Sequence, residues 1–599
     1  MITSGYSKRL GFLIFCLTFT LTMCGAAVAA PTNTTHVNLN QSSANQNTVQ
    51  LNTTSNYINS SKSQKSTGTI KLPDPQIYRN GKSVGTYSTI AAAINAAKSG
   101  DTIMLASGAT FNEHGLTIGK NLDFNVFNNG QATINAQGKG QVFFIMGGIV
   151  VKLQNLIIEN GKATDGGAIS NVGALTVKDC TFKDNTATSD GGAISNDGTL
   201  NINKSMFTGN TATSDGGAIY NLPMSFNVTG TTFTSNSANS GGAIYNSDFS
   251  ALTVTRSTFT GNNAGGGGGA IMNNGNLTVT SSTLTSNIVT SSNGEGGVIF
   301  NVGNATIQFN RIVDNNASQG NDIYNFDSGK MNATLNWWGY NSQSNIAKQI
   351  VNKGVSLTYN PWIILTIQAN PVNAIVGGHS IINAALVFTS NSVYYTATGV
   401  VPYTGSANFK TSNGIIKYSY FSNGVSGSTL TDLTTAEVVT VSTTVDHQTV
   451  SKKVYVTGAT ISQLISSAAY VKNYYESHSV LPTSVTISGQ KITMPQLLAL
   501  LITATININN GNLNPLPVLT VNPASNPSGN YTNGNIYKSA YLKIAQTIKD
   551  YISTNDKAPN NLKSSLGLIT FSKLVYIYSK IINYYGLNKE LPNYVSIGK

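Results

Sequence analysis

The sequence predicts a mainly β protein with three folded parts: a right-handed parallel β-helix, then a β-sandwich, then small α-helical repeats. Three observations predict this. A Gly-Gly-Ala-Ile-x-Asn phrase recurs with a period in the twenties, short alternating apolar runs follow it, and the C-terminal third changes to helical spacing. A fixed period of this size indicates stacked coils, because each coil can bury its apolar face only against its neighbours.

The repeat is regular in spacing and in content. It begins at Gly166, Gly191, Gly216, Gly241, Gly268 and Gly296, the last with Val298 in place of Ala, so its steps are 25, 25, 25, 27 and 28 residues. A worn copy follows at residues 321–325. Each period also holds an alternating strand, such as residues 175–177, and a Phe-x-x-Asn turn, such as Phe182 to Asn185. Alternation predicts strands, and Gly, Asn and Asp supply the corners between them, so one period is predicted to form one three-sided coil.

Stacking the coils places equivalent residues in ladders, because neighbouring strands lie about 4.8 Å apart. We expect the Ile of each repeat inside the coil and the Asn at a corner, where the amides bond to one another along the axis. The Ile ladder comprises Ile169, Ile194, Ile219, Ile244, Ile271 and Ile299, and the Asn ladder comprises Asn171, Asn196, Asn221, Asn246, Asn273 and Asn301.

Both ends of the repeat region carry a predicted cap, which a solenoid needs to protect its open edges. Residues 89–97 have helical spacing and precede the predicted first strand at 100–105, and residues 332–339 hold two of the three Trp. Repeated Gly-Gly-Ala-Ile-x-Asn coils that end in Asn-Trp-Trp-Gly resemble the adhesin-like surface proteins of methanogenic archaea. The resemblance covers about residues 73–345, the predicted extent of the β-helix.

Composition and the N-terminal segment predict an exported protein. Only 10% of the 599 residues are charged, and residues 1–29 have the order of a signal peptide: Lys8 and Arg9, an apolar stretch at 10–21, and small residues at 27–29. An uncleaved anchor is the alternative. No later segment offers 18 uninterrupted apolar residues, so we expect no membrane span after cleavage and a location outside the cell, at the wall or cell surface.

Residues 30–72 are rich in Thr, Asn, Ser and Gln and predict a disordered spacer. Glycosylation acceptor triplets occur there and further along the chain, although many arise by chance in a sequence rich in Asn and Thr. They begin at Asn33, Asn52, Asn59, Asn227, Asn276, Asn304, Asn316, Asn332 and Asn530.

From residue 359 to 457 the repeat gives way to short alternating runs, which predict an Ig-like β-sandwich that acts as a spacer. The predicted strands lie at 363–367, 384–388, 414–418, 437–441 and 450–456.

The C-terminal third contains three copies of a helical unit that align on a proline: 468–482, 545–559 and 578–592. A second short helix is predicted at 492–498 and at 569–575, with Thr493 and Thr570 as N-caps. The predicted units are one repeat at 459–505, a linker at 506–534, and two repeats at 535–599.

This unit resembles the pseudomurein-binding repeat, with its helix followed by Leu-Pro-x-x-Val-x-Ile. The match is close in the first and third copies, while the second has Ala558 before the proline and Ser564 in place of the Ile. The third copy stops at Lys599, before a second helix. The resemblance implies that the repeats bind a pseudomurein cell wall. The predicted wall-binding residues are Lys472, Tyr474, Tyr475, Pro482, Lys549, Tyr551, Pro559, Tyr584, Tyr585, Pro592 and Tyr594.

The local charge agrees with a polymer that carries carboxylates. Residues 459–599 hold 11 Lys and 4 acids, which gives +7 of the total +12, and 12 of the 27 Tyr. The competing interpretation is that the Tyr eight residues before each proline is a core residue of its helix.

An enzymatic β-helix is the main alternative, since glycoside cleavage needs two facing carboxylates and lyases need Ca²⁺ with a basic residue. The single acid ladder, Asp165, Asp190 and Asp215, precedes Gly-Gly in each copy, so ordinary turn chemistry and a Ca²⁺ site both stay open. Only four Arg occur in the chain, and none forms a ladder with Lys. We therefore predict no catalytic, metal or cofactor site, and take a wall-tethered polysaccharide lyase or glycoside hydrolase as the alternative.

Two further classes are excluded. Pseudomurein-binding repeats also accompany wall-cleaving endopeptidases, which need a Cys beside a His, but Cys180 has no His near it in sequence and is predicted to be a buried apolar residue. Nucleic-acid binding is excluded because the chain is exported, nearly lacks Arg and has no base-reading motif. The sequence thus predicts a non-enzymatic adhesin-like surface protein, anchored to the wall by its C-terminal repeats. Its β-helix would present a face to an unknown surface glycan or cell-surface partner.

Overall fold

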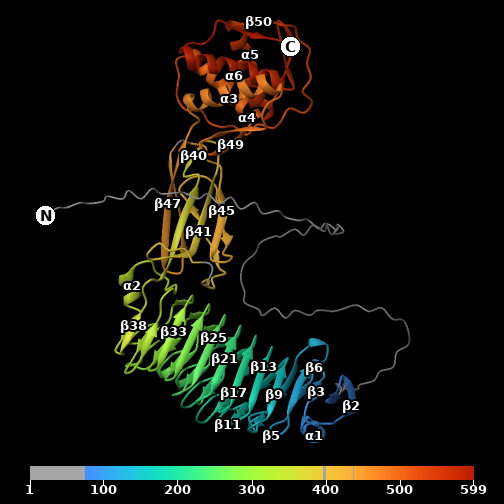
Figure 1. The fold of residues 1–599 in the computed structure, drawn as a ribbon, viewed down its shortest axis with the longest axis vertical. Coiled ribbons are helices and arrows are strands. Elements are labelled where there is room, and N and C mark those ends of the chain that lie inside the picture. The colour runs from blue at the N-terminus through green and yellow to red at the C-terminus, as the bar shows by residue number, and fades with distance from the viewer. Residues whose placement is uncertain (1–73, 396–398, 436, 599) are drawn as a thin grey trace, which may run out of the picture. The chain divides into compact units, whose positions relative to one another are not determined.

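The computed structural model describes residues 74–395, 399–435 and 437–598 (Figure 1). The predicted signal peptide, the predicted spacer and the acceptor triplets at Asn33, Asn52 and Asn59 lie outside the described residues. A parallel β-solenoid, a two-sheet β region and a helical region follow one another along the described chain.

In the repeat region one coil of the solenoid contains four strands, and the coils before β11 and after β31 lack the fourth. In the first complete repeat these are β12 (Ile169–Asn171), β13 (Ala174–Lys178), β14 (Thr181–Lys183) and β15 (Thr186–Ala187). Each pairs in parallel with its equivalent in the next coil, so four sheets run along the solenoid. The prediction of a three-sided coil was therefore wrong. The fourth strand was missed because it is as short as two residues and carries no alternation.

We name the sheets A to D. Sheet A contains β1 (Gln76–Arg79), β2 (Lys82–Thr86), β3 (Asp101–Leu105), β6 (Leu122–Val126), β9 (Val150–Gln154), β13, β17 (Thr199–Asn203), β21 (Ser225–Thr229), β25 (Ala251–Thr255), β29 (Asn276–Thr280), β33 (Asn304–Gln308), β36 (Lys330–Asn332) and β38 (Ser356–Thr358). Sheet B contains β4 (Thr110–Phe111), β7 (Ala132–Asn135), β10 (Leu156–Glu159), β14, β18 (Met206–Thr208), β22 (Thr232–Thr234), β26 (Thr258–Thr260), β30 (Thr283–Thr285) and β34 (Arg311–Val313).

Sheet C contains β5 (Leu116–Ile118), β8 (Phe143–Ile145), β12, β16 (Ile194–Asn196), β20 (Ile219–Asn221), β24 (Ile244–Asn246), β28 (Ile271–Asn273), β32 (Ile299–Asn301), β35 (Ile323–Asn325) and β37 (Ile350–Asn352). Sheet D contains β11 (Lys162–Ala163), β15, β19 (Thr211–Ala212), β23 (Ser237–Ser240), β27 (Asn263–Gly267) and β31 (Ile288–Val289).

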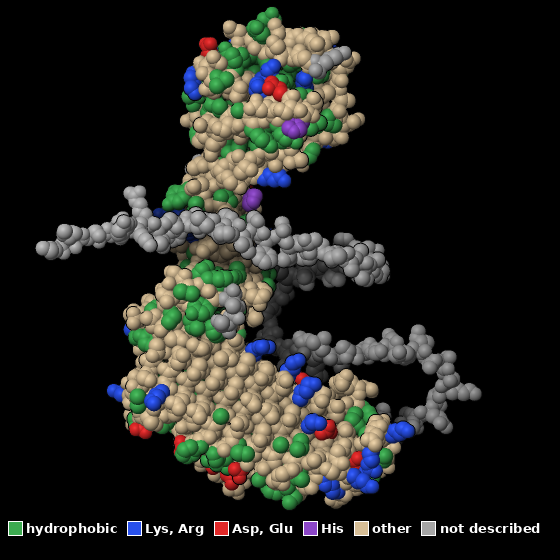
Figure 2. Space-filling view, in the orientation of Figure 1, with side chains coloured by type: hydrophobic (Ala, Val, Ile, Leu, Met, Phe, Trp, Pro, Cys, Tyr) green, Lys and Arg blue, Asp and Glu red, His purple; other side chains and the backbone are tan. Residues whose placement is uncertain are grey.

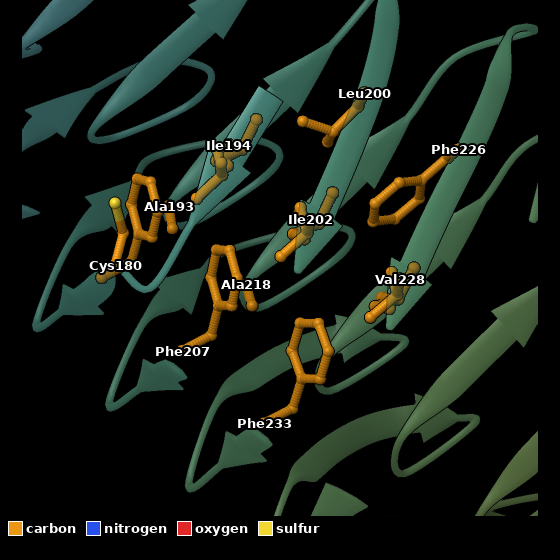
Figure 3. Close-up of a cluster of buried hydrophobic side chains, with 14 of the residues drawn as sticks. Cys180, Ala193, Ile194, Leu200, Ile202, Phe207, Ala218, Phe226, Val228 and Phe233 are labelled. Atoms are coloured by element: carbon orange, nitrogen blue, oxygen red, sulfur yellow. The ribbon is translucent and has the colours of Figure 1, made fainter. Parts of the chain in front are cut away.

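The core of the solenoid is built from ladders of apolar side chains, which are identical in the predicted Ile ladder and vary in others, such as Leu200 beside Phe226 (Figure 3). Every Ile of the predicted Ile ladder is fully buried. The Phe of successive Phe-x-x-Asn turns also stack inside, with ring centroids 4.7 Å apart from Phe182 to Phe207 and 5.0 Å apart from Phe207 to Phe233. One coil thus packs on the next through the same contact each time.

Two ladders of buried asparagines run beside this apolar core. In the predicted ladder each amide nitrogen donates to the amide oxygen of the next coil, for example from Asn196 to Asn221 at 2.8 Å. It extends past Asn301 to Asn325 and Asn352. The second ladder, formed by the Asn of the Phe-x-x-Asn turns, repeats this bond from Asn210 to Asn236 at 2.9 Å. Its amides also bond to backbone groups, so a buried polar group is satisfied in every coil.

The paired glycines of the repeat are required by backbone geometry. The first glycine has a positive φ, 65° at Gly191, which residues with a Cβ seldom adopt. The second lies against the next coil: a Cβ on Gly192 would sit 2.1 Å from the carbonyl oxygen of Gly217. Both positions therefore disfavour a side chain, and this explains why the phrase recurs in six successive coils.

The N-terminal end of the solenoid is covered by helix α1 (Ile90–Ala96), which follows the N-cap Thr89. Both ends of α1 are bonded to the solenoid: the Glu113 carboxylate accepts from the Ile90 and Ala91 amides, and the Lys120 ammonium donates to carbonyls that include that of Ala97. The predicted helix is confirmed. The hairpin of β1 and β2 precedes the predicted first strand, β3.

The solenoid continues past its predicted end at residue 345. After helix α2 (Gln343–Ala347), strands β37 and β38 add one more coil to sheets C and A. Residues 349–352 have lost the paired glycines, so the repeat is no longer visible in the sequence. They keep Ile350 and Asn352, which pair with Ile323 and Asn325 and continue the two ladders.

The β region after the solenoid contains two main sheets that share one core. One contains β39 (Ile363–Asn370), β41 (Ser380–Thr389) and β45 (Val425–Leu430). The other contains β40 (Asn373–Ile375), β43 (Lys410–Thr411), β46 (Val438–Val445) and β47 (Gln448–Thr457), and a small sheet pairs β42 (Ser406–Ala407) with β44 (Ser419–Tyr420). The predicted strand at 414–418 is absent because Gly414 has a positive φ and Ile415 makes only an isolated bridge. An Ig-like topology stays a prediction.

The turn between β46 and β47 contacts the solenoid. Its Asp446 carboxylate accepts hydrogen bonds from the Arg311 guanidinium and from the Trp337 indole, the latter at 2.6 Å. His447 lies 2.7 Å from the Asp314 carboxylate. Trp337 and Val313 belong to the core of the β region, so this part of the predicted Trp cap joins the solenoid to the following sheets.

The helical region contains α3 (Ile461–His478), α4 (Met494–Asn509), α5 (Lys538–Asn555) and α6 (Phe571–Asn588). Two hairpins connect them, β48 (Ser484–Ile487) with β49 (Gln490–Thr493), and β51 (Asn561–Ser564) with β52 (Gly567–Thr570). All four helices share one core, to which residues 506–534, the predicted linker, contribute Leu516, Val518 and Val521.

The third repeat is closed by residues that precede the second. Helix α6 is both the second helix of copy two and the first helix of copy three. The strand after it, β53 (Tyr594–Ile597), pairs with β50 (Gly534–Tyr537), which leads directly into α5. Copies two and three therefore use the same two helices, and the third copy needs no further helix of its own.

The register of the solenoid predicts opposite effects of one charge at two positions. Ile219 is fully buried in a central coil, whereas Thr253 lies on the outer face of sheet A. We expect Ile219→Asp to lower the free energy of unfolding by several kcal/mol, because an unpaired carboxylate is buried, and Thr253→Asp to be tolerated. Urea denaturation followed by circular dichroism measures both, and equal destabilisation would contradict the register.

One buried acid predicts a pH effect. Asp322 occupies the Ala position of the worn repeat, is 2% exposed, and accepts a hydrogen bond from Asn315 at 2.9 Å where the second Asn ladder ends. Burial raises its pKa to about 8 from an ordinary 3.8; the Asn315 bond opposes the shift and nearby Asp314 adds to it. At pH values between 3.8 and about 8, Asp322 is therefore protonated in the folded state and ionised in the unfolded state.

Stability is therefore expected to fall as the pH rises from about 4 to about 8, and Asp322→Asn should remove that slope. Denaturation midpoints at pH 5 and pH 8, read from the fluorescence of the buried Trp337 and Trp338, test this. A variant with the same pH slope as the parent would show that Asp322 is not the group responsible.

Candidate functional site

The outer face of sheet A forms the first candidate site. Its outward side chains lie in parallel rows at one-coil spacing. The middle row comprises Thr176, Asn201, Asn227, Thr253, Thr278, Thr306, Asn332 and Thr358. From β25 to β38 this face is hollowed into an open groove of about 620 Å³, whose lining includes no acid and a single cation, Lys330. Figure 2 shows that the middle of the solenoid surface is uncharged, with charged side chains gathered along its edges.

The lining of this groove contains no carboxylate, and its one basic side chain is Lys330. Its hydroxyl and amide groups are suited to hydrogen bonding with an extended polar chain, and each such bond contributes about 1 kcal/mol net. Affinity would therefore accumulate over several coils. The acceptor residues Asn276, Asn304 and Asn332 all lie in its wall.

The predicted acid ladder forms part of the turns. Asp165 and Asp190 each accept a hydrogen bond through Oδ1 from the backbone amide of the next Asp, at 3.2 Å and 3.0 Å. Burial raises the pKa of Asp215, a hydrogen bond with Ser240 opposes this, and Asp190 adds to it. Across the described ranges, no group of three or more His, Cys, Asp or Glu side chains is placed to hold a metal ion. These contacts favour the turn interpretation of the ladder.

Cys180 belongs to a third ladder, at the corner between sheets A and B. The next coils have Ser or Thr at this position. Each hydroxyl oxygen accepts a hydrogen bond from the backbone amide of the equivalent residue in the preceding coil, as Ser205 does from Cys180. The Cys180 sulfur has the equivalent role, accepting a hydrogen bond from the Leu156 backbone amide at an N–S distance of 3.5 Å. Burial raises the pKa of the thiol to about 12, so it stays protonated and unreactive, and the prediction of a buried residue is confirmed.

The helical region forms the second candidate site, and its three copies end alike. The residue three before each proline has a left-handed backbone: Ser479, Asp556 and Lys589, with φ of 59°, 47° and 61°. Its amide donates to the carbonyl of the residue seven before that proline in every copy. The alignment of three copies therefore describes three equivalent helix ends.

The predicted tyrosines eight residues before each proline lie at the surface. Tyr551 and Tyr584 are each 39% exposed, and Tyr474 is partly exposed and stacks on His478 with centroids 4.2 Å apart. The interpretation of these tyrosines as core residues was therefore wrong. Tyr594 is also exposed and lies edge-on to Tyr537, with ring centroids 6.1 Å apart.

The three predicted prolines are buried and cannot serve as contact residues. Pro482, Pro559 and Pro592 follow the helix ends, where a proline stops a helix. The Pro592 carbonyl accepts a hydrogen bond from the buried Tyr541 hydroxyl at 2.6 Å. Their recurrence in the sequence reflects helix termination.

The remaining predicted residues do not gather into one site. Lys472 pairs with Glu476 at 2.7 Å, and Tyr475 stacks on Tyr576 with centroids 4.5 Å apart. Lys549 is half-buried on α5, and Tyr585 packs against the core. The ring contacts and hydrogen bonds found among the described residues join none of the predicted residues across copies.

Two groups of residues were not predicted. One is an aromatic row on the outer face of sheet C at the variable position of the repeat, where Tyr220 and Tyr245 stand 5.3 Å apart, as do Phe300 and Tyr324. Comparing the residues at the variable position of successive repeats would have predicted this aromatic row. The other group comprises Lys573 and Lys580 on α6 with the rings of Tyr531 and Tyr576; it also contacts the predicted Tyr475, and no repeated pattern marks it.

Comparison with known proteins gives one match. The model of the Chlamydia polymorphic membrane protein repeat matches residues 179–197, 204–222 and 230–247. Each segment runs from the strand of a Phe-x-x-Asn turn to the Gly-Gly-Ala-Ile-x-Asn strand of sheet C. No curated protein and no solved structure matches the chain.

The matched segments cover a small part of the chain, so the similarity concerns the solenoid repeat and not the whole protein. Repeats of this kind on a parallel β-solenoid indicate a surface protein of the adhesin type. No helix in the part of the chain described by the structure is long and apolar enough to cross a membrane.

The turn role of the acid ladder can be tested at Asp190. We expect Asp190→Asn to keep an oxygen that accepts the hydrogen bond from the Asp215 amide, and therefore to keep the melting temperature of the parent. Asp190→Ala removes this acceptor and should lower the stability by about 1 kcal/mol. Calorimetric melting curves recorded with Ca²⁺ and with a chelator provide the measurement. A melting temperature that rises with Ca²⁺ in the parent and not in Asp190→Asn would instead identify a cation site.

Proposed function

We propose that this protein is a non-enzymatic, adhesin-like surface protein that is anchored non-covalently to a pseudomurein cell wall by its helical repeats. The solenoid then presents the outer face of sheet A to a surface glycan or a cell-surface partner. The observation that carries the anchoring proposal is the threefold recurrence of one helix end with a surface tyrosine at the same position.

The composition of the helical region supports a wall polymer as its ligand. Surface tyrosines offer ring faces and hydroxyls, and the excess of lysine over acids attracts carboxylates. Several weak sites on one rigid body raise the overall affinity, because binding at one site raises the effective concentration at the others. The shared core of the four helices supplies that rigid body.

The display role rests on the solenoid. From β25 to β38 its outer face is polar with a single charged lining residue, Lys330, and the groove there follows the direction of coil stacking. An extended neutral polymer lying in this groove would meet the same hydroxyl and amide groups in each coil. The Chlamydia-type repeats support the assignment to surface display.

The alternative is a wall-tethered β-helix lyase or hydrolase. The turn contacts of the ladder count against it, since the Asp165 and Asp190 carboxylates accept from backbone amides and Asp215 bonds to the Ser240 side chain. Release of reducing ends or of unsaturated uronates from a polysaccharide, lost in Asp190→Asn, would favour this alternative over the display role.

The anchoring proposal predicts a specific loss of wall binding. Truncating a repeat would remove part of the shared core, so substitutions in the full chain are the appropriate test. We expect the double variant Tyr551→Ala, Tyr584→Ala to bind pseudomurein sacculi about ten-fold more weakly, the loss expected for two ring contacts. Co-sedimentation measures this, with Tyr418→Ala, Tyr420→Ala in the β region as the matched control for exposed tyrosines.

Binding of the parent protein to bacterial peptidoglycan as strong as its binding to pseudomurein would refute the specificity of the anchor. An equal loss in the control variant would show that the tyrosines of the helical region have no special role.

A further inference from the structure

Three lysines converge where helix α3 packs on helix α6. Lys472 lies on α3, and Lys573 and Lys580 lie on α6 on either side of Tyr576 in the sequence. We call these three residues the lysine cluster. The Lys573 and Lys580 ammoniums lie 5.3 Å and 5.4 Å from the centroid of the Tyr576 ring. The cluster is distinct from the surface tyrosines of the three helix ends.

Lys573 is nearly buried and has no carboxylate partner. It is 5% exposed, and its ammonium contacts the faces of three rings, those of Tyr475, Tyr531 and Tyr576, at 5.3, 5.7 and 5.3 Å from their centroids. Within the described residues no ion pair or hydrogen bond involves this ammonium. Lysine is rarely so buried without a paired anion, because its charge loses hydration.

Among the described residues, the acid that contacts the cluster is Glu476, and it is already engaged. The Glu476 carboxylate accepts from Lys472 at 2.7 Å and from the Tyr576 hydroxyl at 2.9 Å. Burial acts to raise the pKa of Glu476, but these hydrogen bonds outweigh it and the pKa lies below its ordinary value. Glu476 thus stays ionised, and three ammoniums face one carboxylate.

The excess positive charge is costly for the free protein. Burial lowers the pKa of Lys580; Glu476 opposes this, and both Lys472 and Lys573 lower it further. Lys580 relieves part of the cost by donating to the Ser596 carbonyl at 2.8 Å. No comparable partner exists for Lys573 among the described residues, so a bound anion would lower the energy of the cluster.

The cluster is accessible to a ligand. Its rim is open to solvent: the side chains of Lys472 and Glu476 are 26% and 40% exposed, and Lys580 is half-buried. An incoming anion can therefore reach the ammoniums from solvent, with aromatic rings beside it.

The site occurs in one copy of the repeat. In α3 and α4 the residue equivalent to Lys573 is Gln463 or Gln496, whose side-chain oxygen accepts from the backbone amide of the N-cap residue, Thr460 or Thr493. In α6 the residue at this position is Lys573, and its side chain turns to the rings instead. The position equivalent to Lys580 is Tyr470 in α3 and Thr547 in α5.

We propose that the lysine cluster binds carboxylate groups of an acidic polymer, with Lys573 and Lys580 as the ligand contacts and Tyr475 and Tyr576 as the rings beside them. The inference rests on the proposed wall anchoring and names the chemical group that is recognised where α3 packs on α6. The surface tyrosines of the three helix ends would then supply contacts common to all copies, while the cluster supplies selectivity for charge.

The test measures binding of two acidic probes to the full-length protein by titration calorimetry: an oligogalacturonate and a glutamate oligopeptide, with a neutral malto-oligosaccharide as reference. We expect Lys573→Met and Lys580→Met each to weaken acidic-probe binding at least about ten-fold, the loss of one charge-assisted hydrogen bond. Lys491→Met and Lys543→Met, at exposed lysines of the same region, are the matched controls.

Folding is checked by melting temperature. Lys573→Met should keep or raise it, because an unpaired buried charge is replaced by an apolar side chain of similar length. Binding of the parent that weakens with added salt, and a preference for one acidic probe, would support the site and identify the source of the carboxylate as glycan or peptide.

Parent-like acidic-probe binding in both cluster variants, equal losses in the controls, or no acidic-probe binding by the parent would each overturn the proposal. Co-sedimentation of the same proteins with sacculi separates it from the anchoring proposal. If the parent binds sacculi and the cluster variants bind equally well, anchoring stands without a role for the cluster. If the parent fails to bind sacculi, anchoring itself has failed.

Discussion

The amide of a buried asparagine has to be paired, and in this protein the partner is the same amide one coil away. Leaving such a group unpaired costs about 1 to 3 kcal/mol. The bonds from Asn171 through Asn352 and from Asn185 through Asn315 therefore fix which residue faces which in every pair of coils. Slipping the register of one coil would break bonds in both ladders and expose the stacked Ile and Phe. Sheet register, the four-sided cross-section and the rows on the outer faces all follow from this requirement.

The third ladder, to which Cys180 belongs, links the solenoid to the next part of the chain. Asn310 donates to Asn336 at 3.1 Å, and the two residues that follow Asn336 are Trp337 and Trp338. Trp338 packs in the solenoid core, while Trp337 packs in the core of the β region and donates to Asp446. One tryptophan pair thus belongs to two cores. Forces applied to the solenoid are passed to the β region through packed rings and a paired carboxylate.

The sequence predicted what repetition makes visible. The Ile and Asn ladders, the α1 cap and the burial of Cys180 were predicted because each depends on contacts between equivalent residues, which recur at a fixed period. The strands of sheet D escaped because two residues such as Thr186 and Ala187 show no alternation. The last coil escaped because α2 and residues 349–352 lack the paired glycines.

Prediction of the helical region failed where function and structure use the same residues. The prolines recur because they end helices, so recurrence alone could not separate Pro482 from Tyr474 as a binding residue. The pairing of β50 with β53 joins residues about 60 positions apart, and no local pattern reports such a contact. The environment of Lys573 depends on three rings from different segments, which only the folded chain brings together.

The glycine pair that lets one coil rest on the next has a further meaning for how such a protein changes over generations. Because every coil carries the same contacts on both its faces, an in-frame duplication or loss of one period leaves two matching surfaces to rejoin. Each event alters the length of the solenoid by about 4.8 Å and adds or removes one rung of every outer row. The steps of 27 and 28 residues show that extra residues are accepted at the corners without interrupting the ladders. The length of the solenoid, and the number of rungs in each outer row, can therefore change in whole units while the helical region stays the same.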